Sequence, residues 1–97
     1  HKDWLELVQE TSRTIRLDIY TDMDYTVYIG GHKVENYQTL IYKDIETFER
    51  AVREMKITSR NGQPTGFMKE IIHNALKAAQ RGENFSFGGN QEVYCWV

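Results

Sequence analysis

Residues 14–29 read TIRLDIYTDMDYTVYI and decide the fold class, because they contain two alternating segments with a turn between them. In the first segment Ile15, Leu17 and Ile19 share one face and polar residues share the other, as a half-buried β-strand requires. The intervening residues 21–24 are typical of a turn. The stretch therefore predicts two strands of an antiparallel sheet.

Further strands extend this pair along the chain. Gly30-Gly31 predicts a second turn, followed by a third strand that reaches about Tyr42, so that three strands form an antiparallel meander. At the other end, residues 85–97 alternate around a Gly88-Gly89-Asn90 turn and predict a closing β-hairpin. The sheet should therefore have about five strands.

Three segments have the apolar spacing of amphipathic helices. The first covers residues 3–12 with Asp3 as N-cap, and we expect it to pack on the sheet. The second begins at Asp44, and residues 58–64 separate it from a third that runs over residues 65–81. The prediction is a single α+β domain over residues 1–97, in the order α-β-β-β-α-α-β-β.

Composition limits the class of protein. The chain has 97 residues, of which 40% are hydrophobic and 27% charged, as in an ordinary globular domain. Twelve basic against fourteen acidic residues give a net charge of -2, without the basic excess of a typical nucleic-acid binder. No apolar run approaches the roughly 20 residues that span a bilayer, and a lone cysteine forms no internal disulfide. We expect a cytoplasmic protein that does not bind membranes.

Residues with catalytic chemistry are scarce. His32 and His73 lie in unrelated segments and form no HExxH motif, and neither glycine pair joins a strand to a helix as a phosphate-binding loop does. Cys95 alternates with aromatic residues in a terminal strand, where a small buried hydrophobe is the expected role. We expect no catalytic residues, no cofactor and no enzymatic activity.

Three aspartates, Asp18, Asp22 and Asp24, crowd the end of one strand and the turn after it. A calcium loop needs more oxygen ligands and a glycine at set spacing, which the following residues do not provide. Turn formation explains these aspartates, so no metal site is predicted.

Basic side chains suggest one binding function. Four recur at i+4 spacing along the third helix, and two more precede it, which favours an anion or nucleic-acid site. The alternative is an ordinary solvated helix face. The candidate residues are Lys56, Arg60, Lys69, His73, Lys77 and Arg81.

Aromatic side chains suggest a second binding function, contact with another protein. If the alternating apolar residues face the core, several tyrosines and a tryptophan lie on the opposite side of the sheet, and these residue types are enriched in protein interfaces. Two alternatives are that the first helix covers this face, or that the face mediates self-association. The candidate interface residues are Tyr20, Tyr28, Tyr37 and Trp96, with Tyr94 beside them.

In size and in its pattern of short hairpins around amphipathic helices, the chain resembles the small accessory and anti-defence proteins of bacteriophages. The resemblance covers the whole chain without a specific motif, so it implies a way of acting and transfers no residues. It implies a stoichiometric inhibitor of a host protein complex. A protein is the expected partner, and a nucleic acid or a phosphorylated small molecule is the alternative.

Overall fold

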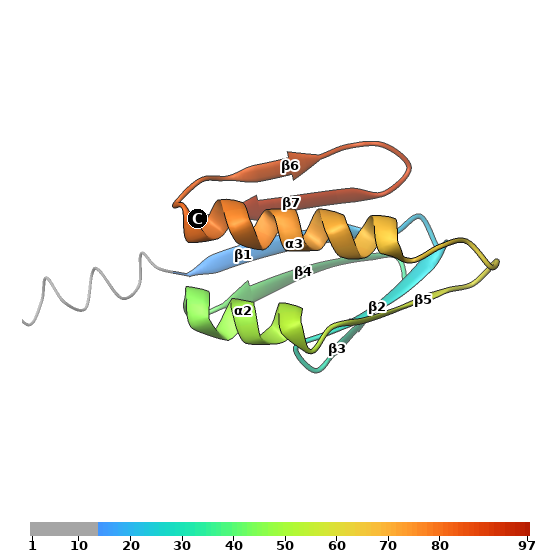
Figure 1. Cartoon of the computed structure of the whole chain (residues 1–97), viewed down its shortest axis with the longest axis horizontal. Coiled ribbons are helices and arrows are strands. Elements are labelled where there is room, and N and C mark those ends of the chain that lie inside the picture. Colours follow the sequence, from blue (N-terminus) through green and yellow to red (C-terminus); the bar gives the residue numbers. More distant parts are fainter. Residues whose placement is uncertain (1–13) are drawn as a thin grey trace, which may run out of the picture.

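The computed structural model describes residues 14–97. Nine elements follow one another along this part of the chain: β1 (Ile15–Tyr20), β2 (Tyr25–Ile29), β3 (His32–Val34), β4 (Tyr37–Tyr42), α2 (Ile45–Arg53), β5 (Lys56–Ser59), α3 (Gly66–Gln80), β6 (Phe85–Phe87) and β7 (Glu92–Trp96). Figure 1 shows their arrangement. The predicted helix over residues 3–12 lies outside the described residues.

The strands form two antiparallel sheets rather than one. The larger has the order β4-β1-β7-β6 and the smaller the order β3-β2-β5. The α+β class and the closing hairpin, β6 with β7, are confirmed. The single five-stranded sheet and the meander are wrong, because β1 pairs with β4 and β7 instead of β2.

Two corners carry the chain between the sheets. At the first, the Asp24 N–H donates to the Thr21 carbonyl oxygen at 3.0 Å, and Asp22 and Met23 adopt positive φ angles. At the second, the Thr21 N–H donates to the Asn36 carbonyl oxygen at 2.8 Å. This contact lies where the predicted third strand divides into β3 and β4, so that strand is not continuous.

Strand β5 occupies part of a region that was expected only to separate two helices. Its residues pair with β2, with Tyr25 opposite Ser59 and Val27 opposite Ile57. Only Ile57 of this strand packs against the core. With one apolar side chain, the strand has no alternation for a sequence pattern to detect.

The start of α2 and the end of α3 are as the sequence predicts. The Asp44 carboxylate accepts a hydrogen bond from the Thr47 N–H at 2.7 Å, which caps α2. Gly82 follows α3 with a φ of 73°, and the Glu83 N–H donates to the Ala78 carbonyl oxygen at 2.9 Å. Within α2, Glu46 forms an ion pair with Arg50, and Glu49 forms one with Arg53.

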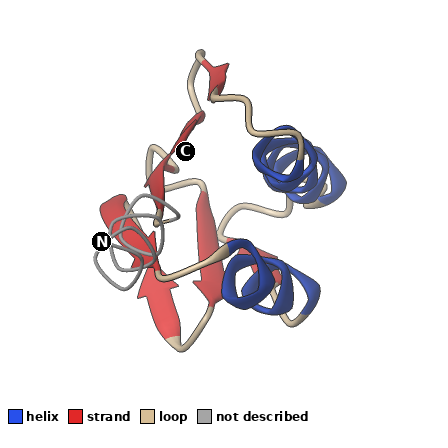
Figure 2. Ribbon diagram, turned by 90° about the vertical axis from the view of Figure 1, so that its left-hand side faces the viewer, coloured by secondary structure: helices blue, strands red, loops and turns tan. Residues whose placement is uncertain are grey.

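Both helices lie on the same side of the four-stranded sheet (Figure 2). Their apolar faces and the inner faces of both sheets bury one continuous core, in which Leu17, Ile19 and Phe48 are fully enclosed. The alternation of residues 15–19 is therefore confirmed. No described element covers the opposite side of the larger sheet.

Candidate functional site

The side of the four-stranded sheet that points away from the helices forms an open surface, which we call the outer face. In the register of its strands, Asp18 pairs with Thr39 of β4 and with Tyr94 of β7, and positions on the same face recur every second residue. The outer face consists of Arg16, Asp18, Tyr20, Tyr37, Thr39, Ile41, Ser86, Glu92, Tyr94 and Trp96.

Three large apolar side chains of this face are open to solvent. Tyr37 is 57% exposed, Ile41 70% and Trp96 47%. Single exposed apolar residues are normal on protein surfaces, but a group on a face without a covering element is typical of an interaction site. The sequence prediction placed Tyr20, Tyr37 and Trp96 on one side of the sheet, and their positions agree with it.

Asp18 lies at the centre of the outer face and joins its side chains. It is only 6% exposed, although it points away from the core. The Trp96 Nε1–H donates to Oδ2 at 3.1 Å, and the Tyr37 hydroxyl donates to Oδ1 at 3.4 Å. The Thr39 hydroxyl also donates to Oδ1, and Arg16 Nε lies 3.3 Å from Oδ2. One carboxylate thus fixes side chains from three strands.

The protonation equilibrium of Asp18 reflects this arrangement. Burial alone raises the pKa of a carboxyl group, because the charged form loses hydration. Here the hydrogen bonds from Thr39 and Trp96, together with the charge of Arg16, outweigh burial and lower the pKa of Asp18 below its ordinary value. The carboxylate is therefore charged at neutral pH, as an acceptor for several donors must be.

The end of the outer face near Tyr20, where β1 ends, is more polar than the end near Arg16. The Tyr20 hydroxyl donates to the Asp22 carboxylate at 3.5 Å, and the Tyr94 hydroxyl donates to Glu92 at 2.5 Å. The hydrogen bond to Glu92 raises the pKa of Tyr94. The face thus has a cation, Arg16, near the start of β1 and carboxylates near its end.

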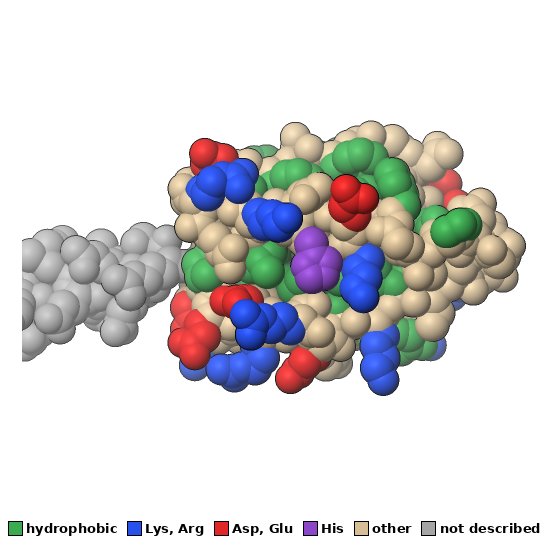
Figure 3. Space-filling model, in the orientation of Figure 1, with side chains coloured by type: hydrophobic (Ala, Val, Ile, Leu, Met, Phe, Trp, Pro, Cys, Tyr) green, Lys and Arg blue, Asp and Glu red, His purple; other side chains and the backbone are tan. Residues whose placement is uncertain are grey.

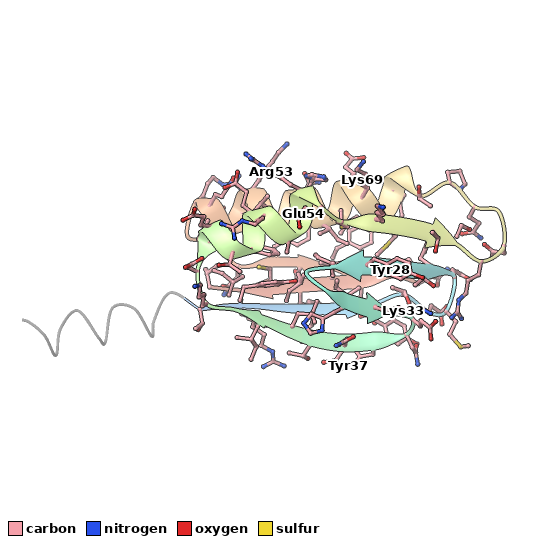
Figure 4. All side chains as sticks on the ribbon, turned by 90° about the horizontal axis from the view of Figure 1, so that it is seen from below. Tyr28, Lys33, Tyr37, Arg53, Glu54 and Lys69 are labelled. Carbon is pink, nitrogen blue, oxygen red and sulfur yellow. The ribbon has the colours of Figure 1, made fainter. Side chains whose placement is uncertain are left out.

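Tyr28 was expected beside these aromatic residues and lies elsewhere. It belongs to β2 of the smaller sheet, because the chain changes sheet after Tyr20. Lys33 and Lys56 flank it across the strands, and Lys33 Nζ lies 6.0 Å from the centre of its ring. Figure 4 shows Tyr28 and Lys33 on one sheet and Tyr37 near the edge of the other. These residues of the smaller sheet line a depression of about 300 Å³ together with Glu54.

The six basic candidates are divided between two parts of the fold. Lys56 belongs to β5, and Arg60, which follows it, forms an ion pair of 3.2 Å with Glu35. The other four belong to α3 and its C-cap: Lys69, His73, Lys77 and Arg81.

The helical part is mixed in charge. Arg81 pairs with Glu83 at 3.2 Å. Lys69 and Lys77 take part in none of the ion pairs found within residues 14–97. Cationic and acidic side chains are interspersed over the helices in Figure 3, and Lys69 projects away from the sheets in Figure 4.

Cys95 faces the core from β7 and is fully buried, as its alternation predicts. Burial raises the pKa of its thiol to about 11, so the nucleophilic thiolate is disfavoured at neutral pH. Within residues 14–97 no group of three or more His, Cys, Asp or Glu side chains could hold a metal ion. Neither of the helices described is long and apolar enough to cross a bilayer.

Sequence reasoning missed the role of Asp18, which it interpreted only as one of three turn-forming aspartates. An available signal was its position within the alternation of β1, where a carboxylate stands between Arg16 and Tyr20 on the polar side. Its aromatic partners could not be identified, because Tyr37 and Trp96 reach it only through strand pairing.

The chain matches no protein-family model, no curated protein and no solved structure.

Proposed function

We propose that this protein is a non-catalytic binding protein that acts stoichiometrically by docking its outer face onto a protein partner. The observation that carries the proposal is the Asp18 carboxylate, which holds Trp96 and Tyr37 in place on a face with no covering element in residues 14–97. Tryptophan and tyrosine are among the residues that contribute most to binding energy in protein interfaces.

Preorganisation favours binding here. A side chain that becomes ordered on association costs about 0.5–1.5 kcal/mol, and hydrogen bonds that fix its position beforehand reduce that cost. Trp96 and Tyr37 both donate to Asp18, and Ile41 lies on the same face of β4, across Arg16 from Trp96, as an exposed aliphatic contact. The face can therefore present an apolar surface of fixed shape.

The charges of the face define the partner's chemistry. The contact of Arg16 with Asp18 uses Nε, and the Arg16 side chain is 55% exposed. Its Nη groups can therefore reach a carboxylate of the partner. The expected partner surface is an apolar patch with an acidic side chain at its edge.

Ile41→Glu tests the proposal, because Ile41 is the most exposed of the three large residues and makes none of the contacts with Asp18. Wild-type and variant proteins serve as bait in a cell lysate, with Tyr28→Ala as the matched control on the other sheet. A partner bound by both wild type and Tyr28→Ala is then purified and titrated calorimetrically with wild type and with Ile41→Glu. A fixed stoichiometry supports the proposal, and an equal affinity for Ile41→Glu refutes it.

Sedimentation of the purified protein alone separates a partner from self-association. If the protein is a monomer at all concentrations, the outer face is free to bind another protein, as proposed. A dimer that Ile41→Glu converts to a monomer would show that a second copy occupies the face, and would refute the proposal.

Nucleic-acid binding is the alternative proposal, and Lys69 and Lys77 favour it because neither has an ion-pair partner among the residues described. This function predicts a steep loss of affinity with salt, because binding releases counterions from phosphates. Lys69→Glu combined with Lys77→Glu should then abolish retention of nucleic acid by the bait. Retention that is insensitive to salt and to these substitutions would refute it.

A further inference from the structure

A pocket of about 330 Å³ lies where three connections of the chain meet, away from the outer face. The β1–β2 turn, the loop before α3 and the β6–β7 turn come together at the right-hand end of Figure 1, opposite the C-terminus. The lining residues are Asp24, Tyr25, Gln63, Phe67, Phe87, Gly89, Asn90 and Gln91. They come from segments far apart in the sequence.

Aromatic rings form the walls of this pocket. Phe67 and Phe87 meet edge to face, with ring centres 5.6 Å apart. Phe67 lies in the first turn of α3 and is 51% exposed, so its ring is open to a ligand. Tyr25 is almost fully buried, and its hydroxyl lies 3.2 Å from both Gln63 Oε1 and the Pro64 carbonyl oxygen.

Asp24 is the one charged residue among those that line the pocket. Neutral amides hold its carboxylate: Gln91 Nε2 donates to Oδ2 at 3.1 Å, and Asn61 Nδ2 donates to Oδ1 at 3.4 Å. None of the ion pairs within residues 14–97 includes Asp24, and the nearby Arg60 pairs with Glu35. The negative charge is therefore fixed in position without a cation paired to it in this part of the chain.

Gln91 is a buried side chain with one unpaired polar atom. The residue is 5% exposed, and its Oε1 is buried without a hydrogen-bond partner in the described part of the chain. Buried polar atoms are nearly always hydrogen-bonded, so an orphaned acceptor beside a pocket calls for a functional explanation. The Asp24 carboxylate, which the Gln91 amide holds in place, favours a ligand that donates hydrogen bonds.

We propose that this pocket binds the guanidinium group of an arginine side chain presented by a protein ligand. Guanidinium is planar, stacks on aromatic rings, and is more weakly hydrated than an ammonium group. Its N–H groups match the acceptor oxygens of Asp24, while Phe67 and Phe87 provide the apolar contact. This site is separate from the outer face, and the proposal does not depend on the proposed function.

Titration with N-acetyl-arginine amide tests the site, with backbone amide signals of the isotope-labelled full chain as the readout. We expect saturable shifts of the Phe67 and Gln91 amide signals. N-acetyl-citrulline amide has nearly the same shape but no charge, and its affinity should be lower by roughly tenfold or more. N-acetyl-lysine amide should also bind more weakly. Equal binding of the arginine and citrulline compounds would overturn the proposal.

Matched variants locate the binding. Asp24→Asn removes the charge and should lower the affinity roughly tenfold. Asp22→Asn is the control, because Asp22 lies exposed in the same turn and does not line the pocket. Phe67→Ala provides a second test that spares the turn, because the ring is half exposed and its loss removes one wall. Unchanged affinity in folded Asp24→Asn, or in Phe67→Ala if Asp24→Asn does not fold, would overturn the assignment.

Discussion

Asp18→Asn tests whether one carboxylate holds the outer face together. The substitution keeps the shape of the side chain but removes its charge, and it places an NH₂ group where one of the two oxygens accepts hydrogen bonds. The donors affected belong to Arg16, Tyr37, Thr39 and Trp96. At least one of them must lose its acceptor.

The expected loss follows from the exposure of these donors. A hydrogen bond to a charged acceptor contributes about 1.5–3 kcal/mol to stability. A sum over all donors would overestimate the loss, because Arg16, Tyr37 and Trp96 are each about half exposed and can donate to water instead. The free energy of unfolding should therefore fall by about 2 kcal/mol, close to the value of a single such bond.

Urea unfolding followed by circular dichroism at pH 7 measures this loss. With an m value of about 1–3 kcal/mol/M, the midpoint should fall by about 0.7–2 M. Asp22→Asn is the matched control, because this exposed aspartate lies in the next turn, and its free energy of unfolding should change by less than about 0.5 kcal/mol.

The pH dependence gives a second test of the same reasoning. Since folding lowers the pKa of Asp18, its charged form stabilises the native state above the unfolded pKa, and this stabilisation is lost as the pH falls through the folded pKa. The difference in free energy of unfolding between wild type and Asp18→Asn should therefore become smaller below about pH 4. A difference under about 0.5 kcal/mol at pH 7, or one that stays constant at low pH, would refute the role of the carboxylate.

Three further predictions concern backbone conformation, a buried hydroxyl and the cysteine. Gly30→Ala should lower the free energy of unfolding, measured in urea, by about 1–3 kcal/mol, and by more than Gly31→Ala does. Both glycines have positive φ, but only at Gly30 would an added Cβ lie 3.1–3.2 Å from other side chains. Equal losses would contradict the steric argument. Tyr42→Phe should leave stability unchanged or raise it by up to about 1 kcal/mol, because the buried Tyr42 hydroxyl has no partner in the described chain; a clear loss in urea would indicate that the hydroxyl is hydrogen-bonded in solution. Native Cys95 should resist iodoacetamide at pH 7 and react only after denaturation, as mass spectrometry would detect, because burial raises its pKa to about 11; rapid native alkylation would disprove this.

Local sequence patterns predicted the elements that neighbouring residues determine. The alternation of residues 15–19 identified β1 and its buried face, and Asp44 marked the start of α2. The closing hairpin followed from the glycine turn between β6 and β7. Strand β5 was missed, because Ile57 is its one apolar residue in contact with the core.

The candidate site was predictable only in part. The aromatic character of the sheet's polar side was visible from alternation, and Tyr20, Tyr37 and Trp96 do lie on the outer face. Tyr28 was assigned to the same face because alternation says nothing about which sheet a strand joins. Its removal leaves a smaller aromatic group than the sequence predicted.

Local patterns in the sequence identify the residues of most strands and of both described helices, and the side of each that is buried, because alternation and helical spacing act over a few neighbouring positions. The position of β1 between β4 and β7, which brings Tyr37 and Trp96 to Asp18, follows from the packing of the whole chain. The pocket at Asp24 likewise depends on the meeting of distant turns. Strand order depends on how the whole core can be closed, because backbone hydrogen bonds between strands do not distinguish one partner sequence from another.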